Sequence, residues 1–206
     1  MAKSGNPKNR GMNSTIEYYN KHAEEYFRIT AQVELFQLYE RFLEFIPAGG
    51  RIMDLGCGSG RDIKWFRDHG YDAYGLDASE ELVKVVKEQL CLPIEIGNIE
   101  DWITDEPFDG IWCCASLIHL KEEAVLSFFS NLNNNLKRGG VLFMSVKSGI
   151  ETGTDETGRF FLDYNEATIK RMVQCNEALT LQQMWYTEDK MKRNTFRWLN
   201  AIIQLN

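Results

Sequence analysis

The sequence predicts one doubly wound α/β domain built on a mostly parallel sheet. From Arg51 onward, short apolar segments alternate with amphipathic ones, as parallel strands joined by crossover helices do. A turn with glycine at every second position, "GCGSG", directly follows the first apolar segment. The chain has 206 residues and 44% hydrophobic content, which suits one well-buried domain and is short for two.

The segment before the sheet predicts a tail and two helices. Residues 1–13 are polar and basic, so we expect a disordered tail and a single domain over residues 14–206. Ser14 and Glu17 have capping-box spacing and predict the start of a helix. That helix carries the aromatic residues Tyr18, Tyr19, Tyr26 and Phe27. The second helix is indicated by apolar residues at helical spacing before Pro47, namely Leu35, Leu38, Phe42 and Phe45.

Five apolar segments predict the parallel strands: "RIMDLGC" (51–57), "DAYGLDA" (72–78), "PIEIGN" (93–98), "FDGIWCCA" (108–115) and "GGVLFMSVK" (139–147). The fourth is the most apolar, as expected at the centre of a sheet covered on both faces. Between the strands we expect helices from about Gly60 to Gly70, after the cap Ser79, and around 125–132.

The last part of the sequence predicts an antiparallel edge. A polar, glycine-bearing loop over 147–158 and a helix near 165–176 precede two strand-like stretches, 179–189 and 194–205. Only a loop separates these two stretches, so they can pair antiparallel.

Composition excludes several classes of protein. A net charge of −7 argues against nucleic acid as the main partner. The five cysteines are odd in number and lack CxxC spacing, and no apolar leader follows Met1, so we expect no disulfide framework, no metal site and a cytoplasmic location. No apolar run approaches the roughly 20 residues that cross a bilayer, so we expect no membrane partner.

The glycine turn indicates a nucleotide-like ligand. Glycines at the carboxyl end of a parallel strand let the backbone approach a ligand closely. Here Gly56, Gly58 and Gly60 give G-x-G-x-G with Arg61 in the sixth place, which does not match the dinucleotide fingerprint G-x-G-x-x-G/A. Dinucleotide-dependent oxidoreduction is therefore the less favoured alternative.

Two carboxylates define the ligand further. Asp54 would repel a pyrophosphate but attract a ligand that carries an ammonium and a sulfonium. Asp77 ends the second strand, where an acid can accept hydrogen bonds from ribose hydroxyls. Together they predict a nucleoside with a cationic tail, such as S-adenosylmethionine.

Five sequence motifs follow one another along the chain: "MDLGCGSGRD", "YGLDAS", "GNIEDW", "FDGIWCCASLIHL" and "LKRGGVLFMSVK". With them the chain resembles the class I S-adenosylmethionine-dependent methyltransferases from Tyr18 to its C-terminus. The resemblance implies a seven-stranded sheet in the order 3-2-1-4-5-7-6 with only strand 7 antiparallel, and N-terminal helices that cap the site.

The resemblance also assigns residues to the cofactor. The glycines would line the methionine and ribose, Asp54 would hold the amino group directly or through water, and Asp77 would bind the ribose. Tyr19, Tyr26 and Arg28 would be candidates to close the site, with Arg28 pairing with the methionine carboxylate. The set of cofactor residues is Tyr19, Arg28, Asp54, Gly56, Cys57, Gly58, Gly60, Asp77, Ala78, Asn98, Ile99, Glu100 (or Asp101), Cys114 and Ala115.

For the acceptor, the resemblance places His119 near the transferred methyl group. A histidine there could take a proton from an oxygen or nitrogen nucleophile, or it could pack under a loop and bond the backbone. The remaining acceptor candidates are Tyr26, Lys147, Arg159 and Arg197. With no large insertion, we expect a small-molecule acceptor with an O, N or S nucleophile and a monomer or homodimer. A non-catalytic module that binds S-adenosylmethionine stays an alternative.

Overall fold

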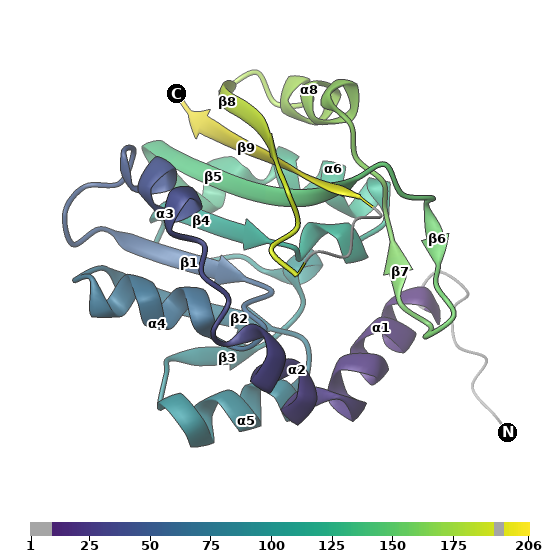
Figure 1. Cartoon of the computed structure of the whole chain (residues 1–206). Coiled ribbons are helices and arrows are strands. Elements are labelled where there is room, and N and C mark those ends of the chain that lie inside the picture. The colour runs from purple at the N-terminus through teal and green to yellow at the C-terminus, as the bar shows by residue number, and fades with distance from the viewer. Residues whose placement is uncertain (1–9, 192–195) are drawn as a thin grey trace, which may run out of the picture.

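The structure is a computed structural model that describes residues 10–191 and 196–206. Residues 1–9 of the expected tail, and the first two residues of the expected strand 194–205, lie outside this part of the chain. Figure 1 shows a layered arrangement in which a twisted sheet lies between two sets of helices, with α1 and α2 at one end of the strands.

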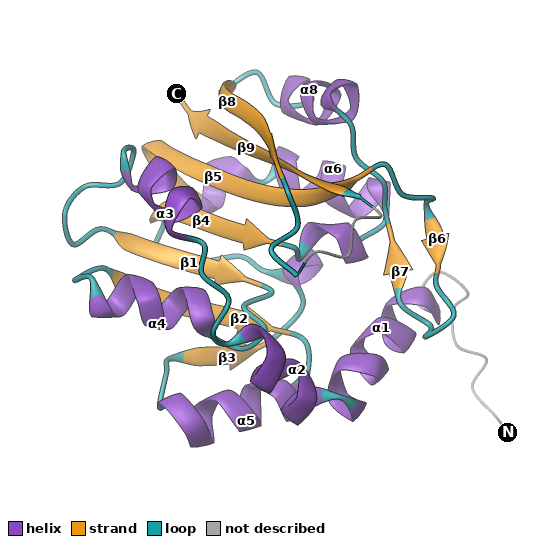
Figure 2. Cartoon of the chain, in the orientation of Figure 1, coloured by secondary structure: helices purple, strands orange, loops and turns teal. Residues whose placement is uncertain are grey.

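The sheet has the expected order and direction (Figure 2). Its strands, from one edge to the other, are β3 (Ile94–Ile96), β2 (Asp72–Asp77), β1 (Arg51–Leu55), β4 (Phe108–Cys114), β5 (Leu136–Ser148), β9 (Arg197–Leu205) and β8 (Leu179–Thr187). The pairs β3–β2, β2–β1, β1–β4 and β4–β5 are parallel, and β9 is antiparallel to both β5 and β8. The predicted order 3-2-1-4-5-7-6 is confirmed, with β8 and β9 as strands 6 and 7.

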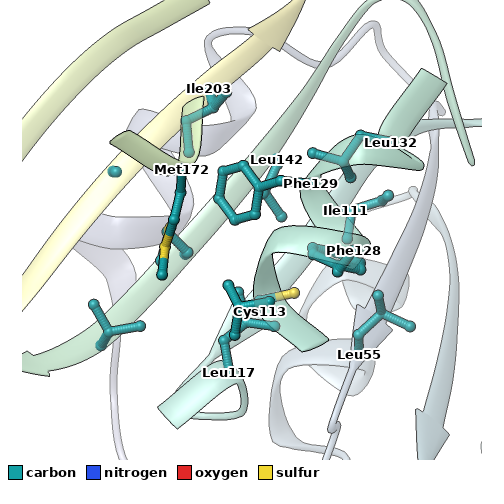
Figure 3. Close-up of a cluster of buried hydrophobic side chains, with 14 of the residues drawn as sticks. Leu55, Ile111, Cys113, Leu117, Phe128, Phe129, Leu132, Leu142, Met172 and Ile203 are labelled. Carbon is teal, nitrogen blue, oxygen red and sulfur yellow. The ribbon is translucent and has the colours of Figure 1, made fainter. Parts of the chain in front are cut away.

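Helices pack on both faces of the sheet. The helices of the described residues are α1 (Arg10–Lys21), α2 (Ala23–Thr30), α3 (Phe36–Leu43), α4 (Arg61–Asp68), α5 (Glu80–Leu90), α6 (Glu122–Ser130), α7 (Leu132–Asn135) and α8 (Glu166–Gln174), and α3 to α8 cover the faces. One apolar core contains side chains of α3, α4 and α5, and the other contains side chains of α6, α7 and α8. Figure 3 shows the second core, where Phe128, Phe129 and Met172 pack beside Leu142 and Ile203 of the sheet.

The N-terminal segment differs from the prediction. Helix α1 begins at Arg10, so residues 10–13 are helical and Ser14 lies inside the helix instead of capping it. The Ser14 hydroxyl donates to the Gly158 carbonyl at 2.6 Å, which gives it a tertiary partner in place of the helix amides. The expected single aromatic helix is also divided, because α1 ends at Lys21 and α2 begins at Ala23.

The expected polar loop contains a small hairpin. Strands β6 (Gly153–Thr154) and β7 (Phe160–Phe161) pair antiparallel. Asp155 makes the turn between them, because its Oδ1 accepts from the amides of Thr157 and Arg159. The hairpin docks on α1, where the Phe160 amide donates to Thr15 Oγ1 at 3.0 Å. A loop expected to be solvated is therefore joined to the N-terminal helix.

Candidate active site

Two adjoining cavities lie where β1, β2 and β4 end. The first is lined by Thr15, Ile16, Tyr19, Tyr26, Gly56, Gly58, Asp77, Ala78, Ser79, Leu82, Gly97, Asn98, Ile99, Cys114, Ala115, Ser116, His119 and Leu120. The second lies between α2, α3, β7 and the segment that follows β8. Five residues belong to both linings and form a shared wall: Tyr19, Tyr26, Cys114, Ala115 and His119.

The glycine turn forms part of the first cavity. Gly56 and Gly58 have φ of +75° and +53°. A Cβ at Gly56 would lie 2.4 Å from Ser116 Cβ, and one at Gly58 would lie 3.1 Å from the Tyr26 ring. Only glycine fits this close packing with a left-handed backbone. Gly60 has another role, because a Cβ there would lie 2.7 Å from Val86 Cγ1, and Gly60 lines neither cavity.

Asp77 is fixed by the turn itself. Its Oδ2 accepts from the Gly58 amide at 2.8 Å, and its Oδ1 accepts from the Ser79 amide at 2.9 Å. Burial raises the pKa of Asp77, and these amide hydrogen bonds oppose the rise. Each carboxylate oxygen has about two acceptor sites, so Asp77 can still accept from a ligand in the first cavity.

Asp54 lies behind the turn and lines neither cavity. Its side chain is buried, and within the described residues its Oδ2 has no hydrogen-bond partner. Burial raises the pKa of Asp54 well above its usual range, and the nearby charge of Asp62 adds to the rise. A cationic group at the turn would relieve this cost. Of the two contacts expected for Asp54, direct or through water, its position behind the turn favours the one through water.

An ion pair absent from our predicted site lies beside Asp54. Arg61 donates through Nε and Nη2 to both oxygens of Asp62, at 2.6 and 2.8 Å. Asp62 also accepts from the Tyr39 hydroxyl and from Trp112 Nε1. Burial opposes ionisation of Asp62, but the Arg61 charge and these hydrogen bonds outweigh it and lower the pKa of Asp62. Arg61 lines the second cavity. The sequence feature that could have identified it is its position directly after the glycine turn.

Tyr19 and His119 meet at the shared wall. The Tyr19 hydroxyl lies 2.9 Å from His119 Nε2, and His119 Nδ1 lies 2.7 Å from the Phe160 carbonyl oxygen. A carbonyl only accepts, so the neutral ring carries its proton on Nδ1, and Nε2 accepts from Tyr19. Burial lowers the pKa of His119 to about 4, and the charges of Lys147 and Arg159 contribute. The ring is therefore neutral at neutral pH.

The expected acceptor residues separate into two groups. Lys147 and Arg159 line the second cavity with Tyr26 and His119. Arg159 pairs with Asp155 at 2.9 Å, and the Lys147 ammonium lies 3.9 Å from the centre of the Phe161 ring. Arg197 lines neither cavity, because its exposed guanidinium lies over the Tyr186 ring instead.

Three expected cofactor residues also lie outside both cavities. Arg28 is exposed on α2, two residues beyond Tyr26, and residues two apart on a helix point roughly 200° apart. Glu100 is exposed as well, so Asn98 is the expected polar residue that reaches the first cavity. Cys57 is buried, and burial raises the pKa of its thiol well above the usual range, as expected for a packing residue.

Several lining residues were absent from our predicted site. Thr15 and Ile16 come from the part of α1 expected to be the helix start, and Ser116 and Leu120 flank the expected His119. Ala115 has φ of +61°, an uncommon backbone conformation that concentrates at functional sites. Its position between the two cavities fits that tendency.

The fold and the glycine turn define the class of protein: a Rossmann-like α/β domain with a nucleoside-type site at the carboxyl ends of its strands. A family model described as a methyltransferase domain matches residues 26–194, and the chain belongs to this family. The resemblance to the class I S-adenosylmethionine-dependent methyltransferases is thereby confirmed.

Individual relatives agree with this membership. The Bacillus subtilis (strain 168) protein YqeM is 31% identical over 128 residues, which cover 59% of this chain and 52% of YqeM. A ubiquinone biosynthesis O-methyltransferase of Xanthomonas campestris pv. campestris (strain B100) is 30% identical over 106 residues, 48% of this chain and 43% of that protein. The chain spans about half the length of the curated relatives it matches.

A solved structure shares the whole fold. The Burkholderia thailandensis 1,6-didemethyltoxoflavin-N1-methyltransferase, with bound 1,6-didemethyltoxoflavin and S-adenosylhomocysteine, has a TM-score of 0.78 and 12% identity, and the match covers 100% of this chain and 93% of that chain. In the described part of our chain, no helix has the length and apolar character needed to span a bilayer.

Proposed function

We propose that this chain transfers a methyl group from S-adenosylmethionine, bound in the first cavity, to a small-molecule acceptor in the second. This proposal rests on the shared wall. Tyr19 and His119 line both cavities, so a reacting group beside them would face the cofactor and the acceptor. Methyl transfer is an in-line displacement that depends on alignment and exclusion of water. A module that only binds the cofactor has no need of the second cavity.

The residues of the first cavity fit this cofactor. The glycine turn brings backbone close to the ligand, and Asp77 can accept from ribose hydroxyls. Asp54 has a raised pKa and an unpartnered Oδ2, and a cationic tail at the turn would favour its charged form, directly or through water. The Burkholderia neighbour, whose fold is shared, holds S-adenosylhomocysteine, which also supports the proposal.

When bound, the cofactor supplies an electrophilic methyl group. The chain's own residues supply a path for the acceptor proton. As the acceptor's bond to hydrogen breaks, the proton passes to Tyr19 Oη, while the Tyr19 proton passes to His119 Nε2 along the 2.9 Å contact. His119 then carries a positive charge, and its Nδ1 proton stays bonded to the Phe160 carbonyl. His119 thus acts through Tyr19.

Two measurements test this function. Calorimetry should detect binding of S-adenosylmethionine and S-adenosylhomocysteine but not NAD, and a methyl-release screen over small-molecule pools should identify an acceptor. With that acceptor, Tyr19→Phe and His119→Asn should each lower kcat by roughly 10²–10⁴ while S-adenosylmethionine affinity changes little. Tyr74→Phe is the control, because Tyr74 lines neither cavity and its hydroxyl donates to Asp72.

The outcomes are separable. Absence of S-adenosylmethionine binding, or of transfer to any acceptor, contradicts the proposed function. Near-wild-type kcat in both Tyr19→Phe and His119→Asn contradicts only the proton path, and leaves alignment and desolvation as the catalytic contributions.

A further inference from the structure

The second cavity has an apolar mouth. In the described part of the chain, five large apolar side chains are exposed: Ile29, Phe36, Ile96, Ile103 and Met191. Three of them, Ile29, Phe36 and Met191, line the second cavity, at 42%, 48% and 41% exposure. They come from α2, from α3 and from the segment after β8, so folding brings together three separate parts of the chain at this mouth. Exposed apolar side chains gathered at one cavity indicate an apolar ligand surface.

The inner end of the same cavity is basic. Arg61 and Arg159 line it with side-chain exposures of only 19% and 25%, and Lys147 is half-buried beside them. Asp62 and Asp155 each occupy Nε and Nη2 of an arginine that has five N–H donors, so donors remain for a ligand. The positive potential reaches the shared wall, since Lys147 and Arg159 both lower the pKa of His119.

Three acids also line this cavity, two of them exposed and one buried. Glu34 and Glu188 are exposed at the mouth, together with Lys190. Asp189 is buried and accepts from Trp198 Nε1 at 3.1 Å. The cavity therefore has apolar side chains with mixed charge outside, and inside it has the remaining N–H donors of two paired arginines, Lys147 and the buried Asp189. An acidic group can accept from these N–H donors, whereas an ammonium group has only donors and would be repelled by a sulfonium nearby.

We propose that the acceptor is an amphiphilic weak acid, whose acidic head reaches the basic inner end while an apolar body lies against Ile29, Phe36 and Met191. This inference rests on the proposed function and names its substrate class. Each methylene placed at the mouth should tighten binding about threefold to fourfold until the apolar surface is covered.

The test uses simple amphiphiles on the protein saturated with S-adenosylhomocysteine, whose binding is measured first. Calorimetry compares butyrate, hexanoate and octanoate with butylamine, hexylamine and octylamine. We expect carboxylate affinity to rise roughly tenfold for each two added methylenes, and each amine to bind at least about tenfold more weakly than its matched carboxylate.

Variants assign the two ends of the ligand. Phe36→Ser and Met191→Ser should flatten the dependence on chain length, while Ile103→Ser, which removes an apolar side chain 69% exposed and outside both cavities, should not. Lys147→Met should remove most of the preference for carboxylate over amine.

Three results would overturn this inference: affinity independent of chain length, equal or tighter binding of the amines, or the same flattening in Ile103→Ser. If S-adenosylhomocysteine itself fails to bind, the proposed function fails instead, so the two failures are distinguishable.

Discussion

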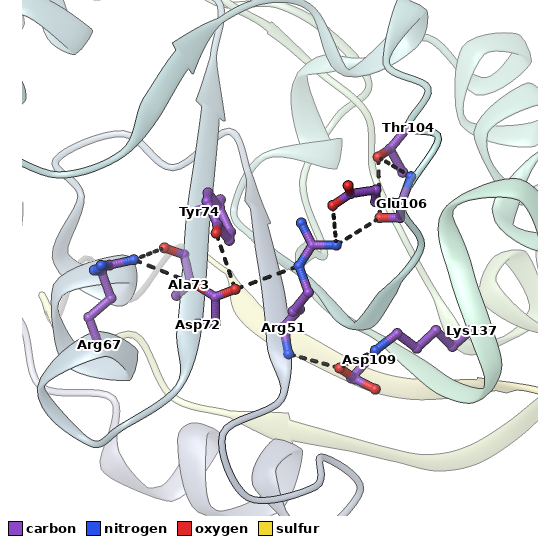
Figure 4. Close-up of polar contacts among 9 residues, drawn as sticks. All are labelled: Arg51, Arg67, Asp72, Ala73, Tyr74, Thr104, Glu106, Asp109 and Lys137. Atoms are coloured by element: carbon purple, nitrogen blue, oxygen red, sulfur yellow. Dashed lines mark hydrogen bonds and ion pairs between the residues drawn. The ribbon is translucent and has the colours of Figure 1, made fainter.

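The two ends of the parallel strands hold charged groups in opposite ways, and β1 touches both. At its amino end, Arg51 contacts Glu106 and Asp72, and its amide donates to Asp109 (Figure 4). These groups are solvated and paired. Three residues later Asp54 is buried with an unpartnered oxygen, beside the Arg61–Asp62 pair. The solvated charges at the amino end can be replaced at little cost in stability. The buried charges at the carboxyl end are costly to leave without a partner, so they favour binding of an oppositely charged group.

The largest effect should follow a change in the glycine turn. Gly58→Val should weaken S-adenosylmethionine binding by roughly 100-fold or more, because φ of +53° is strained for valine and the Tyr26 ring would have to move. Calorimetry measures this loss. Gly70→Val is the matched control, since Gly70 also has positive φ but nothing within 4 Å of its Cβ. Equal losses in both variants would contradict a cradle at Gly58.

Next in size is the buried pair. Asp62→Ala should lower the free energy of unfolding by about 3–5 kcal/mol, because it leaves the Arg61 cation buried without its carboxylate. Urea unfolding measures the change. The double variant Arg61→Met with Asp62→Ala should recover part of the loss, and a fully additive double variant would contradict the coupling.

Asp54→Asn should instead raise the free energy of unfolding of the apo protein. The pKa of Asp54 is raised in the folded state, so its contribution to stability is present below the unfolded pKa near 3.8 and is lost as pH rises toward the folded pKa. The asparagine does not titrate. Urea unfolding at a series of pH values should therefore show a stability gain for the variant that grows from about pH 4 upward. A gain independent of pH would exclude ionisation as its cause.

The smallest effect belongs to the amino end. Arg51→Ala should cost at most about 1 kcal/mol, because its partners Asp72 and Glu106 have side chains 42% and 76% exposed and the pairs are screened by solvent. Urea unfolding of this variant beside Asp62→Ala measures the contrast directly. A loss of stability as large as that of Asp62→Ala would contradict the difference between the two ends of the parallel strands.

Local patterns predicted most of the fold, and contacts between distant segments account for the errors. The strands and Ser79 were readable from alternation and capping, and Ser79 does accept from the Leu82 amide. Ser14 has the same local pattern as a cap, but its hydroxyl bonds Gly158, 144 residues away. Short-range chemistry cannot distinguish these two serines.

The site shows the same limit. The glycine turn and Asp77 are local to strand ends, and the structure places them together at the first cavity. Arg28 was expected at the cofactor because helix orientation cannot be read from the sequence, and α2 directs Tyr26 inward and Arg28 outward. The contact of Tyr19 with His119 joins residues 100 positions apart, so only the folded chain reveals it.

Helix α1 contributes both to the first cavity and to the contact between Tyr19 and His119. It supplies Thr15, Ile16 and Tyr19 to the first cavity, and it is tied to the hairpin through the Phe160 amide and Thr15 Oγ1. A displacement of α1 relative to β4 and the loop that follows it would therefore separate Tyr19 from His119 as it opened the first cavity. In the function that we propose, one displacement of this helix would both open the cofactor cavity to solvent and interrupt the proton path.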